Sequence, residues 1–134
     1  MELRLADVYL LYAEALVRQS KQQATALDYL NKIRQRARNS AGGGATVLPD
    51  YPPFGSDAAL LQAIEKERRV ELAFENHRWF DLVRTERAKE VMIQEQKEQN
   101  GFNASTWSDN MLLFPIPLQV IQSNPEKIKQ NPGY

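Results

Sequence analysis

The apolar residues between Leu60 and Phe74 recur at helical spacing and form two neighbouring lines along one predicted helix. One line holds Leu60, Ala63, Glu67, Val70 and Phe74, and the other holds Leu61, Ile64, Arg68 and Leu72. Each line carries a charged residue in its middle, whereas a solvated helix would place its charges on the opposite face. Because a buried lone charge is very costly, we expect Glu67 and Arg68 to be at least partly buried, each with an oppositely charged partner.

The residues that follow supply candidate partners for these two charges. A break near Asn76 and His77 leads into a segment that carries further arginines and an aspartate. We predict that Glu67 or Glu71 pairs with an arginine of that segment, and that Arg68 pairs with an acid such as Asp81 or Glu75. The predicted structural ion cluster consists of Glu67, Arg68, Glu71, Arg78, Asp81 and Arg84.

The glutamates of this helix also allow a chemical interpretation. Glu67, Glu71 and Glu75 are i, i+4 neighbours and could hold a metal or perform acid–base work. Such spacing more often supports a charged helix, so we favour the structural cluster and predict no metal site. His77 is the single histidine of the chain, which rules out a histidine triad or an HExxH zinc site.

Two further helices are predicted before this stretch. The first runs from Leu3 to about Arg18, and only Asp7 and Glu14 interrupt its apolar surface. The second runs from about Ala24 to Arg38, so that residues 2–40 have the size of a tetratricopeptide hairpin. Because apolar residues cover the first helix on more than one side, we expect it to need several neighbours, and we predict that the chain self-associates.

Loops and prolines divide the rest of the chain. Residues 41–56 contain three successive glycines and three prolines, which exclude a regular element. A third helix is predicted from a cap at Ser56 or Asp57 to about Asn76, and a fourth from Arg78 to about Glu90, both within residues 57–99. Residues 100–134 form a loop and a proline-rich extended and turn segment, in which Pro117 to Gln122 could make one or two helical turns. The predicted fold class is all-α, with residues 1–134 in a single domain.

Composition excludes several classes of function. Lysine and arginine number 17 and aspartate and glutamate also number 17, so net charge gives no reason to expect nucleic-acid binding. There is no cysteine, which excludes thiolate catalysis, and no apolar run long enough to span a membrane. We assign no catalytic residue and no cofactor. A glycosidase would need two carboxylates at a set separation, whereas the acids here lie mostly on one amphipathic helix.

Four aromatic residues in predicted loops are candidates for binding a sugar. Flat aromatic faces beside amides and carboxylates are typical of glycan sites, and Trp107, Tyr51, Phe54 and Phe102 fit this description. The alternative, that these aromatics anchor loops to the core, is favoured for each of them. Trp79 and Phe80 are predicted to be core residues because of their helical spacing with Leu82 and Val83.

Four segments in order resemble the SusD/RagB-like nutrient-binding lipoproteins of Bacteroidetes. They are RLADVYLLYAEAL, LNKIRQRA, ERRVELAFENHRWFDLVR and LFPIPLQVIQSNPEKIKQNPGY, which ends on the NPGY of the family's C-terminus. They are distributed in order along nearly the whole chain. Because family members are several times longer, the resemblance implies a C-terminal portion without the lipid-anchor cysteine.

The resemblance also implies a function. Family members are not enzymes; they capture glycans or other nutrients on the outer-membrane surface and cap a SusC-like TonB-dependent transporter. The family's glycan-stacking aromatics lie mostly upstream of the matched region, so none is transferred to a residue of this chain. The alternative is a helical protein–protein interaction scaffold with no small-molecule ligand in this chain, supported by the apolar first helix.

Overall fold

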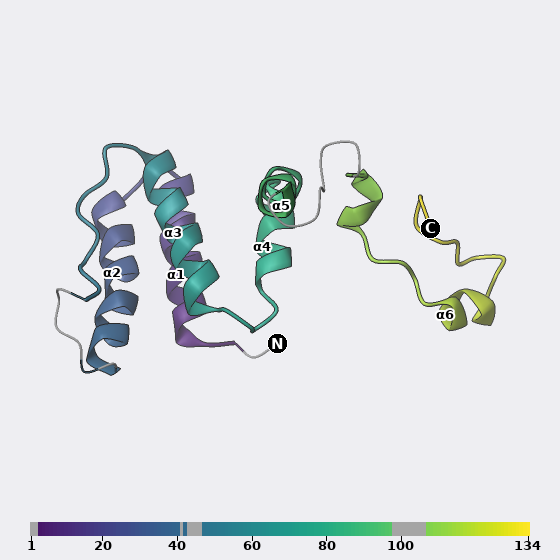
Figure 1. Ribbon diagram of the computed structural model, residues 1–134, viewed down its shortest axis with the longest axis horizontal. Helices are drawn as coiled ribbons and strands as arrows, with labels where there is room; N and C mark the ends of the chain where they lie inside the picture. The colour runs from purple at the N-terminus through teal and green to yellow at the C-terminus, as the bar shows by residue number, and fades with distance from the viewer. Residues whose placement is uncertain (1–2, 41, 43–46, 98–106) are drawn as a thin grey trace. The chain divides into compact units, whose positions relative to one another are not determined.

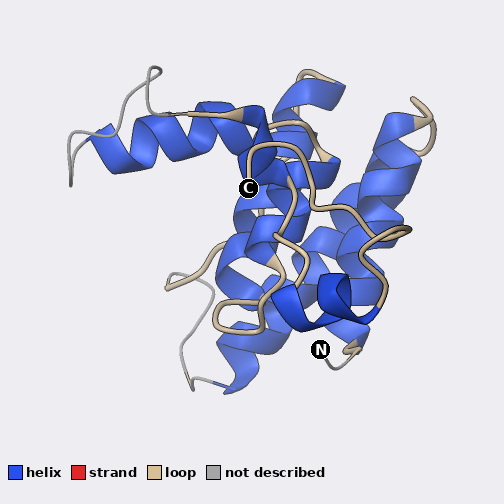
Figure 2. Cartoon of the chain, turned by 90° about the vertical axis from the view of Figure 1, so that its right-hand side faces the viewer, coloured by secondary structure: helices blue, strands red, loops and turns tan. Residues whose placement is uncertain are grey.

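The computed structural model describes residues 3–40, 42, 47–97 and 107–134, and the elements in these ranges are helical (Figures 1 and 2). No strand occurs in the described ranges, and the all-α fold class with a tetratricopeptide-like hairpin is confirmed. None of the helices described combines the length and apolarity needed to cross a membrane. The chain divides into two compact units, Met1–Arg78 and Trp79–Tyr134, and the single-domain assignment stays a prediction.

Three helices form the first unit. They are α1 (Leu5–Arg18), α2 (Gln23–Ser40) and α3 (Asp57–Glu71), and α1 contacts both of the others (Figure 1). Leu10, Leu30 and Ile64, one from each helix, are almost completely buried at the centre of their shared core. Burial of a side chain of this size contributes roughly 1.5–3 kcal/mol.

The end of α1 and the start of α3 follow local rules. α1 ends in a Schellman turn, in which the Lys21 N–H donates to Leu16 O while Ser20 adopts a φ of 52°. Ser56 caps α3 by accepting a hydrogen bond from the Ala59 N–H at 3.2 Å, as the sequence predicted.

The predicted end of the third helix was wrong. α3 ends at Glu71 rather than near Asn76, because Phe74 and Asn76 adopt the left-handed conformation with φ of 66° and 62°. As a result Phe74 does not continue the buried line that begins at Leu60. Its side chain is fully exposed, and Val70 is 67% exposed.

The predicted fourth helix consists of two helices, α4 (Arg78–Arg84) and α5 (Ala88–Lys97). The break between them is another Schellman turn, in which Glu86 has a φ of 60° and the Arg87 N–H donates to Leu82 O at 2.9 Å. The Thr85 hydroxyl also donates to Asp81 O, which gives a carbonyl at the end of α4 a second partner.

The second unit has a small core of its own. Leu82, Ala88, Val91 and Trp107 are buried there, and Trp79 packs against them. Phe80, which was also predicted to be a core residue, is instead 53% exposed.

The proline-rich end is held by side-chain amides. It contains a 3₁₀ helix, η1 (Asp109–Leu112), and the short α6 (Leu118–Ser123), which matches the predicted helical turns. The Gln130 amide bonds both the N–H and the C=O of Ile116, at 2.7 and 2.9 Å, as a neighbouring strand would. The Tyr134 hydroxyl donates to Leu113 O at 2.9 Å, so the last residue fastens the segment as well.

One face of α1 is apolar and exposed. Leu5, Val8, Leu11 and Tyr12 lie at helical spacing and are between 40% and 64% exposed. The core side of the same helix is already occupied by α2 and α3. The Tyr12 ring contacts Tyr29 of α2, and the rest of this outer face stays largely exposed within the described residues of its own unit.

We expect the chain to self-associate through this face, because association removes apolar surface from water. Sedimentation velocity at high micromolar concentration should show species heavier than the 15.4 kDa monomer. Val8→Glu should shift the distribution toward monomer. The control, Val47→Glu, changes an exposed valine outside the helices and should have no effect. A clean monomer for the unsubstituted chain would contradict the prediction.

Candidate functional site

The buried charges of α3 pair with residues of the two preceding helices. Arg68 Nη1 donates to Asp7 Oδ1 of α1 at 2.8 Å, and both residues are at least 95% buried. Arg34 Nη1 of α2 donates to Glu67 Oε2 at 2.9 Å, with both side chains about nine-tenths buried. Each pair joins α3 to a different helix, and Glu67 and Arg68 are buried as the interrupted apolar lines predicted.

The structure gives these glutamates partners that the sequence did not indicate. Glu67 binds Arg34 of α2, and Glu71 binds Arg36 of α2 and Arg4, the residue before α1. A pair between either glutamate and an arginine of α4 stays a prediction. Asp7 is a partner of Arg68 that the sequence analysis did not name, and the pairing of Arg68 with Asp81 stays a prediction.

The remaining residues of the predicted cluster make pairs of their own. Arg78 Nη1 lies 3.0 Å from Glu65 Oε1, and Arg84 Nη2 lies 2.8 Å from Asp81 Oδ1. The second of these is a local i, i+3 pair on α4.

A signal for the missed partner was present in the sequence. Asp7 and Glu14 interrupt the apolar surface of α1 just as Glu67 and Arg68 interrupt that of α3, and both are buried. The same rule, applied to both helices, would have suggested a pair between them.

Arg4 binds the C-terminal end of α3. Its guanidinium contacts both oxygens of the Glu75 carboxylate, at 2.9 and 2.6 Å, and Glu71 Oε1 at 3.0 Å. Arg4 Nη2 also donates to the backbone O of Glu71 at 2.8 Å, one of the carbonyls that a helix leaves unpaired at its end. Arg36 donates to the Glu71 carboxylate from the other side, at 2.7 Å.

The bidentate contact shifts the pKa of both partners. Hydrogen bonds from Arg4 lower the pKa of Glu75 below its ordinary value of 4.5, and hydrogen bonds from Glu75 and Glu71 raise the pKa of Arg4. Because the pKa of Glu75 is lower in the folded state, the contact stabilises the fold above pH 4.5. That contribution is lost as the pH falls through the lowered value.

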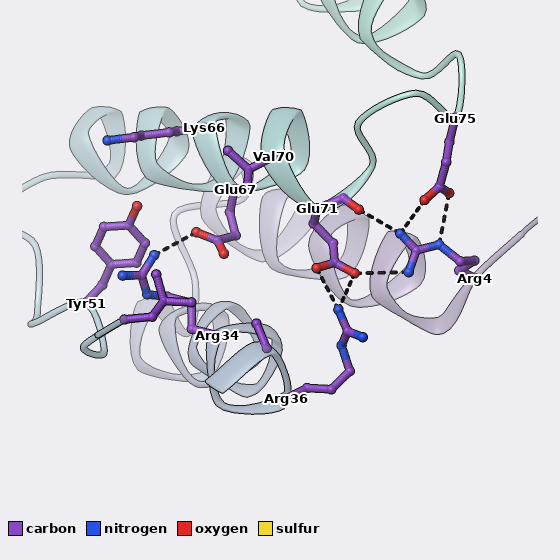
Figure 3. A pocket seen from close by; sticks show the side chains of 11 residues that line it. Arg4, Arg34, Arg36, Tyr51, Lys66, Glu67, Val70, Glu71 and Glu75 are labelled. Atoms are coloured by element: carbon purple, nitrogen blue, oxygen red, sulfur yellow. Dashed lines mark hydrogen bonds and ion pairs between the residues drawn. The ribbon is translucent and has the colours of Figure 1, made fainter. Parts of the chain in front are cut away.

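These ion pairs border a surface cleft of about 760 Å³ in the first unit (Figure 3). Its lining comes from α2, α3, the residue before α1, the loop before α3 and the turn after it. The lining residues are Arg4, Arg34, Arg36, Ala37, Leu48, Tyr51, Lys66, Glu67, Val70, Glu71 and Glu75. A volume of this size is in the range of small-molecule sites. We take this cleft as the candidate functional site.

Contacts with α2 fix the position of Tyr51 in the cleft wall. The Asn31 side chain donates to Tyr51 O at 3.0 Å and accepts from the Tyr51 N–H at 2.8 Å, as a paired backbone would. The Arg34 guanidinium lies 4.1 Å from the centre of the Tyr51 ring, and its Nε donates to Pro49 O. Arg38 holds the same loop through Leu48 O, so Tyr51 is prepositioned.

The structure brings together two of the four predicted ligand-binding aromatics. The rings of Tyr51 and Phe54 are 5.6 Å apart, and both pack against the core of the first unit. Trp107 belongs to the core of the second unit, where it is 9% exposed and its Nε1 donates to Asp109 Oδ1 at 2.9 Å. Phe102 lies outside the described residues. Among the three of these aromatics that the structure describes, only Tyr51 lines the cleft.

A smaller hollow of about 130 Å³ lies beside Trp107 in the second unit, with Val83, Lys89 and Leu112 among its lining residues. It is too small to hold a sugar chain.

Within the described ranges, no group of three or more histidine, aspartate or glutamate residues is arranged to hold a metal ion.

Comparison with known proteins gives a consistent result. A family model described as "SusD family" matches residues 1–134. Two SusD-like proteins of Formosa agariphila are 34% and 36% identical to this chain, each over 98% of it and over 25% and 24% of their own length. The crystal structure of a SusD homolog from Bacteroides thetaiotaomicron superposes with a TM-score of 0.74 at 32% identity. That match covers 98% of this chain and 26% of the other, so the chain spans about a quarter of the length of these proteins.

Arg68→Ala should destabilise the chain far more than Arg87→Ala. Removal of the Arg68 side chain leaves Asp7 buried without its charged partner, which costs roughly 3–5 kcal/mol. Arg87 contacts the exposed Glu90 at 3.8 Å, a surface pair worth roughly 0–1 kcal/mol. Urea melts of the two purified variants measure the difference. Coincident midpoints would mean that Arg68 is solvated.

Trp107→Ala should lower the melting temperature of the chain, because loss of a buried aromatic side chain costs roughly 3–5 kcal/mol. Trp107→Phe is the control, since it keeps an apolar ring in the core while it loses the hydrogen bond to Asp109 and part of the buried volume. Thermal melts and oligosaccharide titrations of both variants are compared. Weaker oligosaccharide binding at an unchanged melting temperature would instead assign Trp107 to a ligand site.

Proposed function

This chain belongs to the SusD family, and on that premise we propose that the protein captures glycans or other nutrients at the outer-membrane surface. It passes them to a SusC-like TonB-dependent transporter and is held at the surface as a lipoprotein. The observation that carries the proposal is the family match over residues 1–134. The relatives supply the class of function, and the cleft supplies a place in this chain where a ligand could bind.

The cleft has the mixture of surfaces that sugar binding requires. Tyr51 offers an aromatic ring, and Ala37, Leu48 and Val70 add apolar patches for the C–H faces of a sugar. Charged side chains around them offer hydrogen bonds to hydroxyl groups. Because Tyr51 is already fixed by Asn31 and Arg34, little ordering entropy is lost on binding.

The charges of the cleft favour binding over catalysis. A glycosidase needs a carboxylic acid whose pKa is raised so that it can protonate the leaving oxygen. In this cleft Glu67, Glu71 and Glu75 each accept a hydrogen bond from an arginine, and the pKa of Glu75 is lowered. We therefore propose a binding protein and no enzyme.

A helical interaction scaffold is the second candidate. The exposed apolar face of α1, formed by Leu5, Val8, Leu11 and Tyr12, favours it, since such faces mark protein–protein contacts. In that case the chain contacts another protein through α1 and binds no small ligand. The two candidates make different predictions for glycan binding.

The test is a glycan array followed by titration of the best oligosaccharide, with the purified SusC-like transporter as a second ligand. We expect oligosaccharide binding, weakened about tenfold by Tyr51→Ala, which corresponds to about 1.4 kcal/mol. Phe74→Ala is the control, because Phe74 is a fully exposed aromatic of the same unit that does not line the cleft. Transporter binding with no glycan binding would favour the scaffold. Binding of neither would overturn both.

A further inference from the structure

The charge of the cleft is distributed unevenly between its two ends. At one end Arg4 and Arg36 contact Glu71 and Glu75, two cations against two carboxylates (Figure 3). At the other end lie Arg34, Lys66 and Glu67, two cations against one carboxylate. The excess positive charge of the cleft therefore lies at the end that also holds Tyr51.

Lys66 is the source of this excess. It is exposed on α3, next to Glu67, and makes no ion pair with any residue that the structure describes. Glu67 is already bound by the buried Arg34, so its charge is compensated without Lys66. An ammonium group at the edge of a cleft attracts an anion without first breaking an internal pair.

The Tyr51 hydroxyl is a second available donor. The backbone of Tyr51 is bound by Asn31 and its ring lies against Arg34, yet its hydroxyl makes no hydrogen bond to the described residues. In Figure 3 this hydroxyl points toward α3, the helix that carries Lys66 and Glu67. Arg34 uses Nε and Nη1 in its hydrogen bonds to Pro49 O and Glu67, which leaves Nη2 as a further donor at the same end.

The size and the apolar lining of the cleft indicate an organic anion rather than a free inorganic ion. About 760 Å³ is far more than one carboxylate or sulfate group occupies, and Leu48 and Val70 line the cleft beside the charged groups. A sugar residue that bears an acidic group satisfies both requirements, because its ring has apolar C–H faces and its substituent carries the charge.

We propose that the Tyr51 end of the cleft binds the carboxylate or sulfate group of an acidic saccharide, with Lys66 and the Tyr51 hydroxyl as its donors. The inference rests on the proposed glycan-capturing function and names the class of glycan. Lys66 supplies most of the charge selectivity and Tyr51 the directed hydrogen bond. Glu67 remains bound to Arg34 and does not compete for the ligand.

The experiment titrates the 134-residue chain with three probes by isothermal calorimetry. The probes are a galacturonate oligosaccharide, a sulfated galactan oligosaccharide of the same length and the corresponding neutral galactan oligosaccharide. We expect at least one acidic probe to bind more tightly than the neutral one, and the difference to shrink at high salt. The two acidic probes distinguish a carboxylate site from a sulfate site.

Variants then locate the site. Lys66→Gln should weaken binding of the acidic probe roughly two- to fivefold, the range of an exposed ion pair, and Tyr51→Phe roughly tenfold. Lys21→Gln is the matched control, because Lys21 is an exposed lysine of the same unit that does not line the cleft. Thermal melts establish that each variant is folded. Tyr51→Phe keeps the ring that contacts Arg34 and Phe54.

Three outcomes overturn the inference. If the neutral probe binds as tightly as the acidic ones and Lys66→Gln has no effect, the acidic subsite is wrong while glycan capture stands. If none of the probes binds and the glycan array is also negative, both the inference and the proposed glycan binding fail for this chain. If Lys66→Gln and Lys21→Gln weaken binding of the acidic probe equally, the effect comes from the net charge of the chain and not from a contact in the cleft. That result would also overturn the proposed site.

Discussion

The first unit depends on the pairing of charges that α3 carries into the core. Removal of Glu67 and Arg68 from water is costly, and the cost is recovered only if each meets an opposite charge with good geometry. Arg34 on α2 and Asp7 on α1 provide that geometry, at 2.9 and 2.8 Å. Because the two partner residues lie on different helices, the pairs define both the rotation of α3 about its axis and its position along α1 and α2. Apolar contacts alone would fix this register less sharply.

The same pairing extends to the surface and builds the cleft. Arg4 and Arg36 neutralise Glu71 from two sides, and Arg4 also contacts the backbone of the last residue of α3. Arg34 pairs with Glu67, its guanidinium lies against the Tyr51 ring, and its Nε donates a hydrogen bond to Pro49 O. One arginine of α2 therefore fixes a buried carboxylate, a loop backbone and an aromatic ring. The cleft wall is consequently an extension of the helix–helix interface.

Helical periodicity predicted most of the fold, and long-range pairing explains what it missed. The spacing of apolar residues located α1, α2 and the start of α3 within one or two residues. The end of α3 and the break before α5 were missed because Phe74 and Glu86 adopt left-handed conformations that their residue types disfavour. Sequence also indicated that Glu67 is buried, but its partner Arg34 is 33 residues away, and local spacing carries no information on that separation. The cleft depends on such contacts, so Tyr51 could be proposed from sequence as an aromatic candidate but Lys66 could not.

Structural ion pairs also determine what the cleft can recognise. A cleft lined by three carboxylates would repel anions if those carboxylates were free. Here an arginine neutralises the charge of each carboxylate. The packing of α3, rather than a ligand, determines where these ion pairs lie. At the Arg4 end of the cleft, the arginines balance the charge of the carboxylates. At the Tyr51 end there is one more positive charge than negative, because Lys66 lines the cleft and makes no ion pair with the described residues. Replacement of Lys66 therefore alters recognition without disturbing the register of the helices, whereas replacement of Arg34 would alter both.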